Sequence, residues 1–310
     1  MKKRFIPLLL LLVLMISACS NGSTEKEVHS QPEGKQVEKQ SETITYQAEN
    51  GPIEVPADPK RIISLFGAPN VISLEGSIVG VDQWTNMNPL FQEKLKGIEE
   101  VSEESLEKII ELEPDLIIVG SWANNIDKLS QIAPTVVYSW GKLDYLTQQI
   151  EIGKLINKEK EAREWVEDFQ KRAEAAGEEI RAKIGEDATV SVIENDDKQL
   201  YVFGNNWARG TEILYQAMGL NMPEKVVEMA LEPGYHALSI EVLPEFAGDY
   251  IVFSKNPDGN SSFLETDTWK NIPAVKNNRV IEINTKSSTY SDPITLEYLL
   301  ELFKEGFLSH

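Results

Sequence analysis

The chain has 310 residues, of which 41% are hydrophobic, and a formal net charge of −20. This length is sufficient for two domains that each bury a hydrophobic core. The acidic composition argues against binding to nucleic acid and against adsorption to anionic lipid, because both favour basic protein surfaces.

The first 18 residues have the composition of a signal peptide. Residues 2–4 are basic and residues 6–16 form an apolar run that is short for a bilayer span. Cys19 follows two small residues and is the only cysteine of the chain, so no intramolecular disulfide is possible. This junction is similar to a bacterial lipobox, which implies that Cys19 is lipidated and anchors the mature chain to the outer face of the cell membrane.

Residues 19–44 are rich in polar residues and have very little to bury, which is typical of a flexible linker. From residue 45 to residue 157, short apolar runs alternate with helical patterns, which predicts an α/β lobe with a mainly parallel sheet. The expected strands are 61–66, 78–81, 115–119 and 135–138, and the expected helices are 70–76, 106–112 and 125–132.

Residues 158–184 form the longest helical pattern. Apolar residues such as Trp165, Phe169, Ala173 and Ile180 recur at helical spacing, and the opposite face is charged. A helix of this length measures about 40 Å, as wide as a domain. We therefore expect a rigid helix that connects two lobes; the alternative is an ordinary long surface helix.

Residues 185–310 repeat the alternating organisation and are predicted to form a second α/β lobe. Its expected strands are 189–193, 199–203, 249–253 and 279–283, and its expected helices are 211–218, 240–246, 269–272 and 293–307. The segment from Glu107 to Asp115 has a counterpart of equal length from Glu241 to Asp249, so the two lobes are predicted to be copies of one unit. By this symmetry Glu107 and Glu241 are equivalent acidic residues at helix starts, suited to basic sites on a two-fold partner. The simpler alternative is that each only stabilises the start of its helix.

Large aromatic residues follow the four expected strands of the first lobe: Phe66, Trp84, Trp122 and Trp140. In open α/β sheets, ligands bind beyond the carboxyl ends of the strands. We therefore interpret these residues as the aromatic floor of a binding site, although core packing is the default role of any one of them.

The second lobe offers Trp207 and Arg209 in a loop before an expected helix, and Tyr290 in the loop after the last expected strand. In an extended loop, residues two apart face the same side, so an indole and a guanidinium would face one ligand. The alternatives are core packing for Trp207 and an intramolecular ion pair for Arg209.

The order of motifs resembles the siderophore-binding lipoproteins of Gram-positive ABC iron importers, most closely their iron(III)-hydroxamate branch. The motifs are Cys19, Asp58-Pro59-Lys60-Arg61-Ile62, Glu107 with Glu113-Pro114-Asp115-Leu116-Ile117, Asn206-Trp207-Ala208-Arg209-Gly210, Ala247-Gly248-Asp249-Tyr250-Ile251 and Trp269-Lys270-Asn271. The resemblance implies two α/β lobes joined by one long helix, the arrangement of a class III substrate-binding protein. It also implies an inter-lobe cleft for the siderophore.

The resemblance further implies roles for single residues. Trp207 and Arg209 match the ligand contacts of the family, and Glu107 and Glu241 match the glutamates that dock onto the permease, which works with an ATPase. Thr289 departs from an aromatic residue of the family, and Phe66 from a tyrosine of some members.

A bare metal ion is not expected to bind the protein itself. The histidines are His29, His236 and His310, and with Cys19 they make no recognisable ligand set. Iron would therefore arrive already coordinated by its chelator, with no metal-binding residue and no cofactor in the protein. A single suitable arginine favours neutral or cationic hydroxamates over anionic catecholates.

Other functions remain as alternatives. The ligand could be a citrate-type or catecholate siderophore, cobalamin, or haem bound through Tyr290. The motifs of a nucleophile elbow or a phosphate loop are absent, so an enzyme is a remote alternative; a purely structural lipoprotein is another. The expected protein is a monomeric binding protein, not an enzyme.

Overall fold

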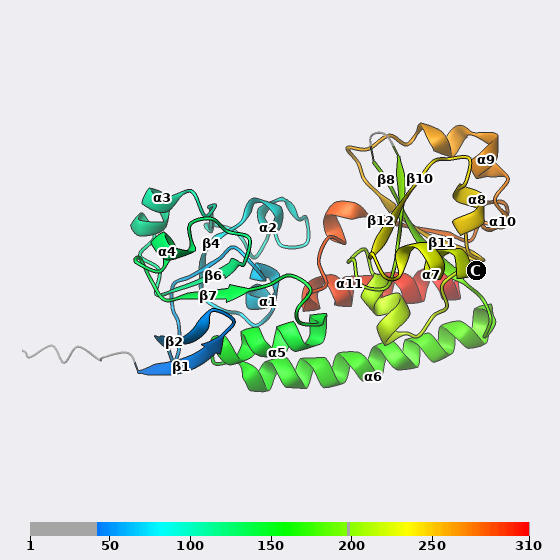
Figure 1. Cartoon of the computed structure of the whole chain (residues 1–310). Helices are drawn as coiled ribbons and strands as arrows, with labels where there is room; N and C mark the ends of the chain where they lie inside the picture. The colour runs from blue at the N-terminus through cyan, green and yellow to red at the C-terminus, as the bar shows by residue number, and fades with distance from the viewer. Residues whose placement is uncertain (1–41, 197–198, 310) are drawn as a thin grey trace, which may run out of the picture. The chain divides into compact units, whose positions relative to one another are not determined.

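The computed structural model describes residues 42–196 and 199–309, which form two five-stranded sheets and a two-stranded hairpin (Figure 1). The predicted signal peptide, the predicted lipidation site Cys19 and the predicted linker up to residue 41 lie outside the described residues. The hairpin of β1 (Thr43–Ala48) and β2 (Gly51–Pro56) begins inside the segment expected to be a linker.

The sheet of the first lobe is parallel throughout. Its order is β5-β4-β3-β6-β7, and short helices connect its strands. A parallel sheet places the carboxyl ends of its strands at the same edge, which is the edge predicted for the ligand. The strands are β3 (Ile62–Ser64), β4 (Ile78–Val81), β5 (Glu99–Glu100), β6 (Leu116–Gly120) and β7 (Thr135–Tyr138), and the helices are α1 (Ala68–Ser73), α2 (Gln83–Met87), α3 (Leu106–Glu111) and α4 (Ile126–Leu129).

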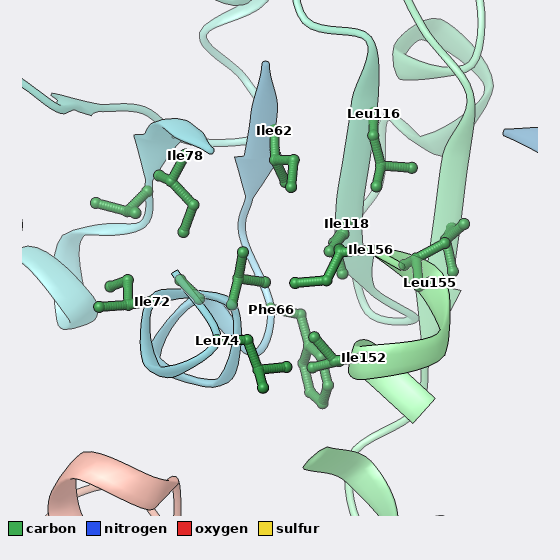
Figure 2. Close-up of a cluster of buried hydrophobic side chains, with 14 of the residues drawn as sticks. Ile62, Phe66, Ile72, Leu74, Ile78, Leu116, Ile118, Ile152, Leu155 and Ile156 are labelled. Atoms are coloured by element: carbon green, nitrogen blue, oxygen red, sulfur yellow. The ribbon is translucent and has the colours of Figure 1, made fainter. Parts of the chain in front are cut away.

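Both faces of this sheet are covered. Ile62, Leu116 and Ile118 lie in one buried cluster (Figure 2), whereas Ile63 and Ile117 lie in a second cluster on the opposite face. Successive side chains of a strand point to opposite faces, so a continuous apolar run serves two cores. This explains why the expected strands read as unbroken runs of isoleucine, leucine and valine.

The predicted connecting helix is confirmed as α6 (Glu159–Ile184), which runs beneath both lobes (Figure 1). Ala162, near its start, belongs to the core of the first lobe. Phe169, Ala173 and Ile180 belong to the core of the second lobe. A single apolar stripe on one helix is therefore shared by two cores. α5 (Tyr145–Leu155), which the sequence did not reveal, and α11 (Pro293–Leu308) pack against it.

The sheet of the second lobe is mixed, so the expectation of a mainly parallel sheet is correct for the first lobe only. In the order β10-β9-β8-β11-β12, strands β8, β11 and β12 are parallel, and β9 is antiparallel to both of its neighbours. The connection from β8 to β9 is too short for a parallel crossover, so β9 has to return as a hairpin strand. The strands are β8 (Val190–Asn195), β9 (Leu200–Phe203), β10 (Tyr235–Leu238), β11 (Tyr250–Lys255) and β12 (Val280–Asn284).

Apart from α11, the helices of the second lobe are short. The helix expected at 211–218 is the π-helix η1 (Glu212–Ala217), and the helix expected at 240–246 forms only as α8 (Leu243–Phe246). The remaining elements are α7 (Glu224–Ala230), the 3₁₀ segments η2 (Ser262–Glu265) and η3 (Thr285–Ser287), α9 (Asp267–Lys270) and α10 (Pro273–Lys276). None of the helices among the described residues has both the length and the apolar character needed to cross a membrane.

The predicted internal repeat is visible in the hydrogen bonds. Asp115 accepts a hydrogen bond of 2.9 Å from the backbone N–H of Arg61, the residue before β3. Asp249 accepts one of 2.9 Å from the backbone N–H of Thr189, the residue before β8. In each lobe, therefore, the aspartate before one central strand fixes the start of its parallel neighbour.

Gly177 supplies a test of the packing of α6. It is buried, and a methyl group on its Cα would overlap the backbone of Met218 at the end of η1. Gly177→Ala should therefore lower the free energy of unfolding by at least about 2 kcal/mol, although alanine favours an isolated helix by about 1 kcal/mol. Denaturant unfolding measures this change. Glu174→Ala, at an exposed position of the same helix, should change stability by less than about 0.5 kcal/mol. A more stable Gly177→Ala protein would contradict the close approach.

Candidate ligand-binding site

Four aromatic residues lie where the sequence predicted them, just beyond the carboxyl ends of β3, β4, β6 and β7, and we call them the aromatic edge: Phe66, Trp84, Trp122 and Trp140. The exposed fractions of the three tryptophans are 68% for Trp84, 58% for Trp122 and 59% for Trp140. Exposed indoles at one sheet edge serve no core and are suited to contact with a partly apolar ligand.

Phe66 differs from the other three. It is buried, its ring stacks on Tyr138 at 5.7 Å, and the edge of Trp122 approaches it at 5.7 Å. Phe66 therefore has little surface left for a ligand, and its ligand contact stays a prediction. It packs against Tyr138 and Trp122, because it lies only two residues after the buried strand β3.

The second lobe brings Trp207 into contact with the aromatic edge. The ring of Trp207 lies 4.9 Å from that of Trp140, at an angle of 75°, and 4.9 Å from that of Tyr235. The same indole lies directly over Gly234, where any larger residue would displace it. Tyr201 continues the row at 5.7 Å from Tyr235. We call Trp140, Trp207, Tyr235 and Tyr201 the aromatic cluster; it joins one residue of the first lobe to three of the second.

The sequence analysis assumed that the loop carrying Trp207 is extended, but the structure shows a turn. Ala208 and Arg209 have φ angles of 55° and 54°, in the left-handed region that side chains other than glycine rarely adopt. The alternation expected of an extended chain therefore does not apply, and Trp207 and Arg209 are placed by separate contacts. Strained backbone that the surroundings hold in place is frequent at functional sites.

Three hydrogen bonds hold this loop. The backbone N–H of Trp207 donates to Thr211 Oγ1 at 2.9 Å, and that of Ala208 donates to Glu212 Oε1 at 3.0 Å. The backbone N–H of Arg209 donates to the carbonyl of Ser288 at 2.7 Å. Each residue of the strained turn thus has a fixed partner.

Arg209 forms the intramolecular ion pair that the sequence left as an alternative. Its Nε donates to Glu194 Oε2 at 2.9 Å and its Nη2 donates to Glu194 Oε1 at 3.1 Å. The guanidinium lies over the ring of Phe203 at 5.2 Å. The side chain of Arg209 retains 20% exposure, so part of its donor capacity is still accessible from outside.

Buried acids surround the same loop. Glu212 is buried, and desolvation raises its pKa, while hydrogen bonds from Ala208, Ser291 and Thr211 act in the opposite direction. Burial likewise raises the pKa of Asp292 to about 6, although hydrogen bonds from Thr295 and the start of α11 lower it. Glu212 therefore connects the loop of Trp207 to the loop that follows β12.

Tyr290 does not join Trp207 and Arg209. Its hydroxyl lies 3.3 Å from Thr85 Oγ1 and 3.5 Å from Asp82 Oδ1, at the start of α2 in the first lobe. Burial raises the pKa of this hydroxyl well above its ordinary value. The hydroxyl group thus forms a contact between the lobes, and because the side chain is only partly buried, the ligand contact of Tyr290 stays a prediction.

The two predicted docking residues are exposed. Glu107 lies in the first turn of α3, as expected. Glu241 lies in the turn before α8 and not within a helix, and a hydrogen bond from Ser239 lowers its pKa. The two residues thus have similar exposure but different local structure.

The sequence analysis did not identify five residues of the site: Glu194, Tyr201, Glu212, Gly234 and Tyr235. Glu194 stands within an apolar strand, and a lone charged residue in such a run is the only signal that pointed to it. Gly234 and Tyr235 lie at an unpredicted edge strand. The contacts of Glu212 depend on a π-helix, which no sequence pattern indicated.

Two further features limit the kinds of ligand that the protein can bind. Within residues 42–196 and 199–309, no three His, Cys, Asp or Glu side chains are grouped so that they could hold a metal ion. A cavity of about 330 Å³ lies at the amino end of β3, bordered by Asp58, Lys60 and Lys158 among others. It contains no aromatic residue, so it offers none of the stacking surface found at the aromatic edge.

Residues 65–286 match the family model described as "Periplasmic binding protein". The chain belongs to the periplasmic binding protein family. The matched region contains the aromatic edge and most of the residues around Trp207, so the membership covers the candidate site as well as the fold.

Individual periplasmic binding proteins are similar over nearly the whole chain. The iron(3+)-hydroxamate-binding protein FhuD of Bacillus subtilis (strain 168) is 36% identical over 307 residues, 96% of this chain and 95% of that protein. The structure of FhuD2 from Staphylococcus aureus with bound ferrioxamine B is 34% identical, with a TM-score of 0.77, and the match covers 81% of this chain and 99% of that one.

A third relative is a FhuD-fold periplasmic binding protein component of a ferrichrome ABC transporter from Bacillus subtilis. It is 36% identical with a TM-score of 0.79, over 86% of this chain and 100% of that chain. These relatives are substrate-binding proteins, and they confirm the resemblance and the two-lobed fold. The roles of the single site residues stay predictions.

The ion pair of Arg209 supplies a test of its structural part. Arg209→Ala should lower the free energy of unfolding by about 3 kcal/mol, because it leaves Glu194 buried without its partner. Denaturant unfolding measures the loss. Arg163→Ala is the matched control: it removes an arginine from an exposed pair with Glu159, which should cost less than about 1 kcal/mol. Equal effects of the two substitutions would contradict a buried, structurally important pair.

Proposed function

We propose that this periplasmic binding protein captures iron(III)-hydroxamate siderophores outside the cytoplasmic membrane and delivers them to the permease of an ABC transporter. The observation that carries the proposal is the aromatic cluster, in which one residue of the first lobe meets three of the second beside the guanidinium of Arg209. The names of the relatives, which bind hydroxamates or belong to a ferrichrome transporter, support the ligand class.

The chemistry of a ferric hydroxamate fits this arrangement. The chelator fills the coordination sphere of the iron, so the protein has to recognise only carbonyl oxygens and apolar arms. Indole and phenol rings supply contact area at low conformational cost. Arg209 can donate to a ligand oxygen through the part of its guanidinium that Glu194 does not occupy.

Glu107 and Glu241 are the proposed contacts with the permease. Both are exposed, and they occupy corresponding positions in the two copies of the repeat. One acidic residue on each lobe is suited to two equivalent basic sites on a two-fold symmetric permease, where charge complementarity speeds the encounter. Lipidation of Cys19 would keep the protein close to that permease.

The first experiment is a ligand titration of the purified protein. Ferrichrome and ferrioxamine B should quench tryptophan fluorescence to saturation, because the exposed indoles lie at the proposed site. Trp207→Leu should weaken binding about tenfold or more, as expected for a central aromatic contact.

The matched control is Trp165→Phe, which alters an indole of α6 that stacks on Phe169 and donates to Glu297. It should leave the affinity unchanged. Quenching by cobalamin but by neither hydroxamate would replace the proposed ligand class with a different one.

The second experiment concerns delivery to the permease. The double substitution Glu107→Ala and Glu241→Ala should abolish siderophore uptake by cells while ligand affinity stays the same, because neither glutamate belongs to the aromatic cluster. Uptake of radioactive iron and fluorescence titration measure the two effects.

Glu111→Ala with Glu245→Ala is the matched control, since it removes one exposed glutamate from α3 and one from α8, close in sequence to Glu107 and Glu241. It should leave uptake near the normal level. If the control pair abolished uptake equally, docking would depend on the total charge and not on the two named residues.

A further inference from the structure

We propose that Glu194 determines which ligand charge the site accepts, by cancelling the charge of Arg209 as well as fixing its position. This inference rests on the proposed function, because it concerns the same ferric chelate site. It assigns to a residue of the buried sheet a role in selecting ligands that it does not itself touch.

The geometry shows how completely Glu194 engages its partner. Glu194 lies in β8 with 7% of its surface exposed, and both of its carboxylate oxygens accept hydrogen bonds from Arg209. Ser254 Oγ donates to Glu194 Oε2 at 2.8 Å, and Thr285 Oγ1 donates to the same atom at 3.1 Å. The carboxylate is therefore held by two donors of Arg209 and by the hydroxyl groups of Ser254 and Thr285.

The Arg209–Glu194 pair is neutral overall, but the guanidinium still offers hydrogen-bond donors in a fixed direction. A bidentate pair places one negative charge beside one positive charge, so a ligand some ångströms away experiences a small dipole. The accessible part of Arg209 can still donate a hydrogen bond to a neutral carbonyl oxygen. A highly anionic chelate loses favourable hydration when it binds, and only an uncompensated positive charge would offset that free energy. Arg209 paired with Glu194 does not provide such a charge.

The neighbouring acids act in the same direction. Asp82, Glu212 and Asp292 lie around the loops that hold Trp207, Arg209 and Tyr290, and none of them forms an ion pair with a lysine or arginine of the described residues. These acids add no positive charge beside Arg209 in either protonation state, and any of them that is ionised adds a negative charge. A neutral or cationic chelate is accepted, and a trianionic one is repelled.

The experiment compares two ferric probes on the purified protein: ferrichrome, a neutral trishydroxamate, and ferric enterobactin, a trianionic triscatecholate. Glu194→Gln keeps the size of the side chain and an oxygen acceptor but removes the negative charge. We expect the ratio of the affinities for ferric enterobactin and ferrichrome to rise about tenfold or more, because one uncompensated positive charge then faces three negative ones. The affinity for ferrichrome should change by less than about threefold, since the hydrogen bond to a neutral oxygen is retained.

Two controls separate charge from position. Glu194→Asp keeps the charge but shortens the side chain, so it disturbs the bidentate geometry and should leave the ratio of affinities unchanged. Glu282→Gln makes the same chemical change in an exposed pair with Lys255 and should also leave the ratio unchanged. A structural role alone would lower both affinities together in Glu194→Gln and Glu194→Asp, with no change in the ratio, and would overturn the proposal.

Arg209→Gln provides an independent measurement if Glu194→Gln does not fold. This substitution leaves the negative charge of Glu194 uncompensated, so the ratio of the affinities for ferric enterobactin and ferrichrome should fall. An unchanged ratio would also overturn the proposal. Failure of the unaltered protein to bind ferrichrome would refute the proposed function itself. Binding of ferrichrome with a ratio that Glu194→Gln does not alter would refute only the charge-selecting role of Glu194.

Discussion

The sharing of one helix between two hydrophobic cores is the constraint on which the rest of the structure depends. α6 contributes Ala162 to the core of the first lobe and Phe169 to that of the second. Because the two cores are built on one rigid element, the carboxyl edges of the two sheets have a fixed relation to each other. The contact between Trp140 and Trp207 follows from it, and so does the candidate site. The geometry of the candidate site thus depends on core packing as much as on the exposed rings.

The site itself combines rigid parts with a strained one. The tryptophans of the aromatic edge follow buried parallel strands, whereas the loop of Trp207 and Arg209 contains two consecutive residues in the left-handed region. Hydrogen bonds to Thr211, Glu212 and Ser288 hold that loop. Such a conformation costs on the order of 1–3 kcal/mol per residue, and the surrounding buried contacts offset it. The result is a guanidinium whose direction is set before any ligand arrives, which reduces the entropy lost on binding.

Much of the fold could be predicted from the sequence because its signals are local. Continuous apolar runs such as that of β6 indicate a buried parallel strand, and the apolar stripe of α6 indicates a long helix. The hairpin of β8 and β9 was misjudged in direction, since strand patterns carry no information about which neighbour a strand selects. The position of the aromatic edge in the fold was predicted correctly. The sequence did not show that Phe66 also packs in the core, or that the hydroxyl of Tyr290 also reaches the other lobe. The role of Glu194 was marked only by its charge within an apolar strand, because Arg209, Ser254 and Thr285 are distant in sequence. The role of Glu212 had no sequence signal, because its contacts depend on a π-helix.

The position of Tyr290 has one more consequence. The C-terminal lobe sends this side chain to Asp82 and Thr85 of the other lobe, so the lobes are tied at a second place besides α6. Two lobes that are connected at two separate places resist rotation relative to each other. A large closing movement, like that of a hinged binding protein, would have to break this contact. We therefore expect ligand binding to move side chains more than whole lobes.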